Sequence, residues 1–133
     1  MIKHLTKRFL LILLGHVLAS VTSGVVVFIA DQFSVGKIPS LTDIPTILFV
    51  ISVLIAGFAG PPAFLVVLIG EAKSVRNLAY YAVAGCLIGF GIPLYLGMEI
   101  LFQVIGLAFG PVAGAIYWRV AGRNAGWRAV MQN

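Results

Sequence analysis

The chain has 133 residues, of which 61% are hydrophobic and 10% charged, and its formal net charge is +5. Soluble domains carry about 25% charged residues, so this composition excludes a water-soluble core. The basic residues flank apolar runs instead of forming one dense run, which argues against nucleic acid as a partner. Anionic lipid headgroups are the partners that this charge favours.

Four apolar runs follow one another along the chain, each close to or above the roughly 20 residues needed to cross a bilayer. They cover residues 9–30, 44–69, 78–97 and 100–120. The first run follows a basic segment, as in a signal peptide, but it continues through Ser23 and Gly24 to Ala30 without a convincing small-x-small cleavage site, so we expect a retained span. The sequence therefore predicts an all-α integral membrane four-helix bundle, with residues 1–133 forming a single transmembrane domain.

The basic residues predict the orientation of this bundle. Threading the four spans in and out places Lys37 on one side and the other Lys and Arg residues on the opposite side. These others are Lys3, Lys7, Arg8, Lys73, Arg76, Arg119, Arg123 and Arg128. By the positive-inside rule both termini are cytoplasmic, an N-in/C-in topology.

The expected connections between spans differ in length. Residues 31–43 form the one sizeable loop, in which Gly36 and Pro39 are turn formers. Asp43 is placed to cap the second helix, and Pro45 falls in its first turn, where a missing amide is harmless. The second connection covers residues 70–77, and the third, around Met98 and Glu99, is a tight hairpin.

Proline lies inside three of the spans, at Pro61 and Pro62 in the second, at Pro111 in the fourth and at Pro93 late in the third. Each proline removes a helical hydrogen bond and frees a carbonyl about four residues earlier. The sequence thus predicts proline-interrupted spans 2 and 4. Both carry the pattern Gly-Pro-x-Ala, which either a duplicated hairpin or chance explains.

Small residues recur every four positions in the third and fourth spans. The candidate helix-packing residues are Gly85, Gly89, Gly106, Gly110 and Gly114. In lipid, helices associate through close van der Waals contact, which rows of glycine permit. We expect them to pack helices within one chain; the alternative is a face for self-association.

A few polar side chains fall inside the spans and form a candidate intramembrane polar site. They are His16, Ser20, Ser23, Ser52 and Gln103. An ionisable residue at the depth of His16 is a functional hypothesis, because its burial is expensive and requires a partner. A neutral histidine bonded to Ser20, Ser23 or a proline-freed carbonyl is the structural interpretation, and proton or ligand handling is the alternative. Ser52 and Gln103 are expected to bond across helices nearer the outside.

Two segments at the cytoplasmic side carry a resemblance. Residues 70–81, followed by Ala84-Gly85, and the ending 117–126 resemble parts of a family of small uncharacterised bacterial inner-membrane proteins. The resemblance implies location in the bacterial inner membrane and no assigned activity. It directs attention to a cytoplasmic charge cluster of Glu71, Arg76, Arg119 and Arg123. Within it we expect Glu71 to pair with Arg76 or Arg123.

No nucleotide loop, metal-ligand spacing, nucleophile motif or pair of buried carboxylates is present, so we predict no enzyme, metal or cofactor. Cys86 stands alone and is expected to be an inert thiol. The predicted function is that of an accessory, structural or regulatory subunit acting through helix packing. Its expected partners are the lipid bilayer with its anionic lipids, and a second copy or another membrane protein. The alternative is a homo-oligomeric transporter or channel protomer with His16 near the permeation path.

Overall fold

The computed structural model describes residues 2–36 and 39–126, and within them it contains helices and no strands. The elements in chain order are α1 (Ile2–Val35), α2 (Ile44–Ala72), α3 (Leu78–Tyr95), α4 (Ile100–Val120) and the short 3₁₀ helix η1 (Gly122–Asn124). In this part of the chain each of the four α-helices is long and apolar enough to cross a membrane.

Helix α1 extends beyond the predicted span at both ends. Its 34 residues correspond to about 50 Å, against roughly 30 Å of hydrocarbon. Residues 31–35 therefore belong to the helix and not to the loop expected there. Gly36 ends it with a left-handed φ of +65°, and its amide donates to the Gln32 carbonyl at 3.0 Å.

The starts of α2 and α3 differ in how they are capped. Asp43 occupies the position before α2, but its carboxylate accepts a bond from Ser40 Oγ at 2.6 Å and none from a helix amide, so the predicted cap is wrong. Pro45 lies in the first turn as predicted. Asn77 caps α3, because its Oδ1 accepts the amide of Ala79 at 2.9 Å.

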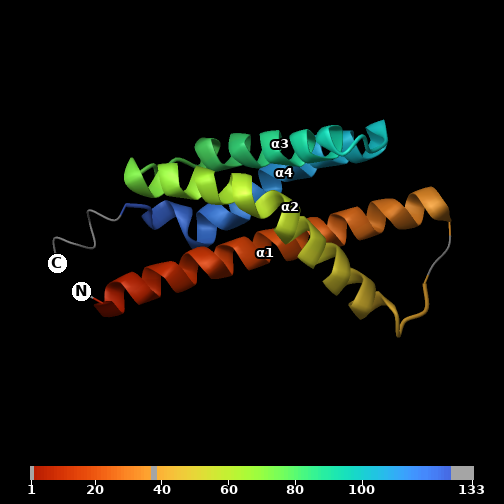
Figure 1. Ribbon diagram of the computed structural model, residues 1–133, viewed down its shortest axis with the longest axis horizontal. Helices are drawn as coiled ribbons and strands as arrows, with labels where there is room; N and C mark the ends of the chain where they lie inside the picture. The colour runs from red at the N-terminus through yellow and green to blue at the C-terminus, as the bar shows by residue number, and fades with distance from the viewer. Residues whose placement is uncertain (1, 37–38, 127–133) are drawn as a thin grey trace.

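The prolines do not divide the spans in which they lie. Helix α2 is continuous through Pro61 and Pro62, and α4 through Pro111, so these prolines lie inside unbroken helices. Helix α2 does change direction near its middle (Figure 1). Pro111 leaves the Leu107 carbonyl without its helical donor, and the thiol of Cys86 on α3 donates to that oxygen at 3.6 Å.

Helix α1 packs against both α4 and α2, and α2 crosses it (Figure 1). Helices α3 and α4 make an antiparallel hairpin, and α2 contacts α3 (Figure 1). We name the end where α1 begins, α2 ends, α3 begins and α4 ends the basic end, since Arg8, Lys73, Arg76, Arg119 and Arg123 lie there. At the opposite, open end, the amino half of α2 diverges from α1 and from the hairpin, whereas α1 stays beside α4 (Figure 1).

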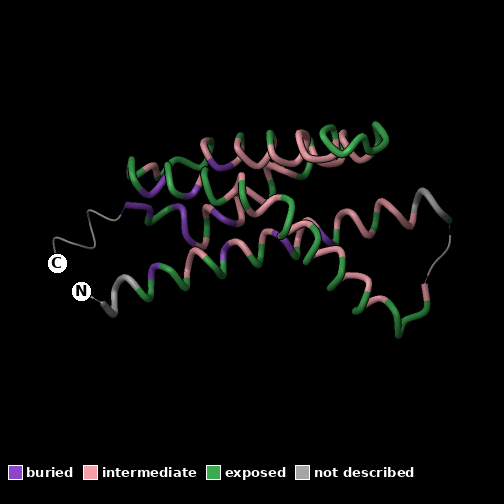
Figure 2. The backbone as a smooth tube through the Cα atoms, viewed as in Figure 1, coloured by how far each residue is buried: buried purple, intermediate pink, exposed green. Residues whose placement is uncertain are grey.

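The tightly packed core lies at the basic end. Val67, Tyr81, Tyr117 and Ala121 form one buried cluster there. Buried stretches of the backbone are coloured purple in Figure 2. Along the remaining helix length large apolar side chains stay exposed, which suits helices whose solvent is hydrocarbon. The fold is thus closed at one end and open at the other.

Candidate functional site

An ion pair joins three segments at the basic end. Glu71, in the last turn of α2, is 2% exposed, and its Oε1 accepts a bond from Nη2 of the buried Arg8 on α1. Its Oε2 accepts the backbone amide of Gly126 at 2.9 Å. One carboxylate therefore holds the start of α1, the end of α2 and the segment after η1. We call Arg8, Glu71 and Gly126 the latch.

The latch corrects the predicted pairing of Glu71 with Arg76 or Arg123. Arg76 instead donates from Nε to the Ala125 carbonyl at 3.0 Å. Arg123, like Arg119, is exposed. The physical reason is that α2 continues to Ala72, so Glu71 is on the helix and turned into the bundle, where α1 supplies the nearest cation.

Aromatic side chains surround the latch. Tyr81 donates its hydroxyl to the Val75 carbonyl at 3.1 Å, and Tyr80 donates to Val66 at 2.9 Å. Trp118 Nε1 donates to the Arg76 carbonyl at 2.7 Å. The Tyr117 ring packs 5.4 Å from that of Tyr81. These aromatic side chains fill the space between the helices at the basic end.

Some buried polar atoms at the basic end have no hydrogen-bond partner within the described residues. Within the described residues, Nε and Nη1 of Arg8 and the hydroxyl of Tyr117 are buried without a hydrogen-bond partner. Buried polar groups in native proteins are nearly always paired, so each of these atoms carries a desolvation cost. Arg8 therefore pairs with Glu71 through Nη2, while its other two guanidinium nitrogens have no hydrogen bond within the described residues.

The predicted glycine rows lie between α3 and α4. A Cβ on Gly85 would overlap the Gly110 carbonyl oxygen, and one on Gly106 would overlap that of Gly89. Gly114 lies equally close to the Tyr81 carbonyl. At this distance the glycine Cα–H groups lie against carbonyl oxygens of the facing helix. One of these is the Gly89 oxygen, which has no helical donor because Pro93 lacks an amide hydrogen. All five glycines thus face contacts inside one chain, and we call them the glycine seam.

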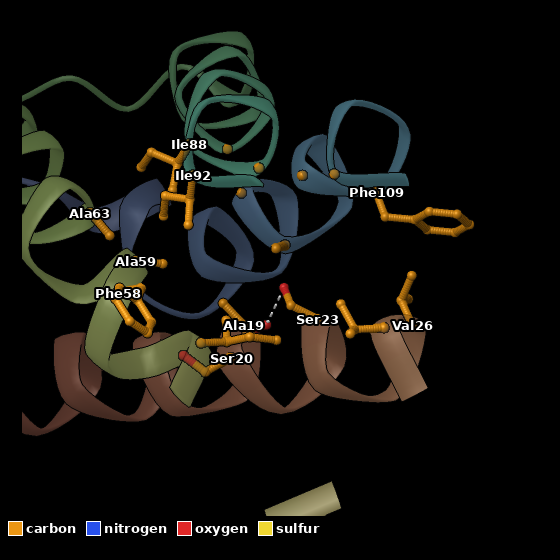
Figure 3. Close-up of a pocket in the computed structure, with 18 of the residues that line it drawn as sticks. Ala19, Ser20, Ser23, Val26, Phe58, Ala59, Ala63, Ile88, Ile92 and Phe109 are labelled. Atoms are coloured by element: carbon orange, nitrogen blue, oxygen red, sulfur yellow. Dashed lines mark hydrogen bonds between the residues drawn. The ribbon is translucent and has the colours of Figure 1, made fainter. Parts of the chain in front are cut away.

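A groove of about 420 Å³ lies between the four helices. Its lining is almost entirely apolar and comes from every helix, including Phe58 of α2, Ile92 of α3 and Phe109 of α4 (Figure 3). This volume falls within the range of about 300–1,000 Å³ typical of small-molecule pockets.

The groove brings together three of the predicted polar residues, His16, Ser20 and Ser23 of α1. Ser23 Oγ donates to the Ala19 carbonyl of its own helix at 3.0 Å (Figure 3). The side chains of His16 and Ser20 have no hydrogen-bond partner in the part of the chain that the structure describes. The Nε2 atom of His16 lies 3.7 Å from where a Cβ on Gly60 would stand, so its ring faces the proline-containing turn of α2.

Ser52 and Gln103 are not brought together, which corrects the predicted bond between them. Ser52 lies against Gly24 of α1. Gln103 donates from Nε2 to the Met98 carbonyl at 2.9 Å, within its own hairpin. The reason is that the amino half of α2 leans away from α4 at the open end (Figure 1).

Comparisons of the chain with protein-family models, curated proteins and solved structures found no match. Among the described residues, no three His, Cys, Asp or Glu side chains are grouped in a way that could hold a metal ion. Function is therefore argued from the latch, the glycine seam and the groove.

Proposed function

We propose that this protein is a small bacterial inner-membrane subunit, with both termini cytoplasmic, that acts as an accessory, structural or regulatory partner through helix packing. The supporting observation is that most described residues belong to four apolar helices, and that the side-chain bonds joining different elements concentrate at the basic end. The surface left for contact with other molecules is therefore mostly apolar helix inside the bilayer.

The basic end is the proposed cytoplasmic end. Lys73, Arg119 and Arg123 are exposed there, beside Trp118. Exposed cations next to an interfacial aromatic suit the anionic headgroups of the cytoplasmic leaflet. We therefore propose anionic lipids as its surface partners.

The open end is the proposed site of protein contact, because the amino half of α2 points away from the α3–α4 hairpin there (Figure 1). A photocrosslinking amino acid placed at Phe49, 70% exposed on that half, should give a discrete protein adduct in native membranes. The matched control is Leu87, 67% exposed on α3. Lipid adducts alone at both positions would contradict the accessory role.

A second candidate function is transport, as one protomer of a homo-oligomeric transporter or channel. The observation that favours it is the position of His16 on the groove, facing Gly60. In proteoliposomes, proton or solute flux abolished by His16→Leu but retained in Thr22→Val, on the same helix outside the groove lining, would establish transport and overturn the accessory role. The scarcity of polar lining argues against a wide aqueous path.

A further inference from the structure

The groove differs between its two ends. Toward the basic end it is bounded by Tyr81 and Tyr117, which are 3% and 6% exposed. Toward the open end it is bounded by Leu96 and Met98, which are 44% and 37% exposed. The groove is therefore closed at the basic end, and it opens to the surroundings toward the open end and alongside Leu54 and Phe58.

Side chains that can form further hydrogen bonds lie toward the closed, basic end of the groove. Tyr117 lines the groove and has a buried hydroxyl with no partner in the described chain. His16 and Ser20 also line the groove, and among the described residues neither side chain makes a hydrogen bond. All three are groups that bond a neutral hydroxyl or carbonyl.

The rest of the lining decides what fills the groove. Toward the open end it consists of apolar side chains such as Ile92, Ile105 and Phe109 (Figure 3 labels Ile92 and Phe109). A buried water needs two to four polar partners, so water cannot fill this part. An ionised head would need a counter-charge. Arg8 and Glu71 pair with each other and do not line the groove, and His16, which does, supplies no charge in its neutral form.

We propose that the groove binds an uncharged amphiphile from the bilayer. Its hydroxyl or carbonyl head lies near His16, Ser20 and Tyr117, and its apolar chain runs toward the open end. The volume of 420 Å³ suits one such molecule. This binding site is independent of the accessory role, which concerns the outer face of α2.

The test uses purified full-length protein in nanodiscs of phosphatidylethanolamine and phosphatidylglycerol. Three diazirine probes of equal chain length are compared: a fatty alcohol, a fatty acid and a plain alkane. Mass spectrometry should map alcohol labelling to groove residues of α1 and α2, in competition with unlabelled alcohol. Tyr117→Phe removes one oxygen and should weaken competition roughly two- to tenfold, the value of one hydrogen bond. Tyr95→Phe, outside the groove, should leave it unchanged.

Other results would overturn the proposal. Equal labelling by alkane and alcohol, together with no effect of Tyr117→Phe, would mean that any lipid chain fills the groove. Preference for the acid, or labelling outside the groove, would exclude a neutral head at this site. Ala59→Phe should fill the groove and remove labelling, whereas Ala108→Phe on the exposed face of α4 should not. If Ala59→Phe fails to fold, the comparison of Tyr117→Phe with Tyr95→Phe still decides.

Discussion

Replacing Glu71 with alanine should lower the free energy of unfolding by about 3–5 kcal/mol, because Arg8 would stay buried without its counter-charge. The amide of Gly126 would lose its acceptor as well. The loss can be measured by denaturation in mild detergent with increasing SDS. Glu99→Ala, at the exposed start of α4, is the matched control and should cost less than about 1 kcal/mol.

The double variant Arg8→Met/Glu71→Leu separates the charge from the packing. Nε and Nη1 of Arg8 have no hydrogen-bond partner among the described residues. The attraction between Arg8 and Glu71 therefore offsets only part of the free energy lost when the two charges are removed from water. Apolar side chains of similar size should therefore restore most of the stability lost in Glu71→Ala. A double variant as unstable as the single one would show that the latch stabilises the fold through more than charge compensation.

Gly110→Ala should destabilise the protein by about 1–3 kcal/mol, because the added methyl group would overlap the Gly85 carbonyl and push α3 away from α4. Gly91→Ala is the matched control on α3, since a Cβ there meets nothing within 4 Å. Alanine favours helix over glycine by about 1 kcal/mol, so this control should be neutral or stabilising.

Thermal unfolding and migration in mild detergent measure both glycine variants. The seam lies within one chain, so Gly110→Ala should lower stability at every protein concentration. A change in oligomer size with unchanged stability of the monomer would instead point to a contact between copies. Equal effects of Gly110→Ala and Gly91→Ala would contradict the role of the seam.

The helical spans could be predicted because their signal is local. Runs of about 20 apolar residues dictate helices in lipid, where backbone groups must bond within their own segment. Gly85 and Gly110 were identifiable for a related reason: spacing by four residues places small side chains along one helix face. Their facing partners follow from the short hairpin between α3 and α4, which allows little choice of register.

The latch could not be predicted, since it depends on which helix faces which. Arg8 lies in a basic flank that usually reaches the headgroups, and 63 residues separate it from Glu71. The sequence held one weak indication that Arg8 faces the bundle: it lies seven residues before Gly15, on the same face of α1. Gly15 packs against Tyr117, so this face is turned inward. The cap at Asp43 failed for a different reason: Ser40 competes locally for its carboxylate.

The central claim, that four helices cross the membrane with the basic end inside, is tested most directly by cysteine accessibility in intact cells. In a Cys86→Ser background, Ser40→Cys marks the connection at the open end and Ser74→Cys marks the connection at the basic end, both at exposed positions. A membrane-impermeant maleimide should label the Ser40→Cys variant in intact spheroplasts and the Ser74→Cys variant only after permeabilisation. Labelling of both variants before permeabilisation, or of the Ser74→Cys variant alone, would contradict the account.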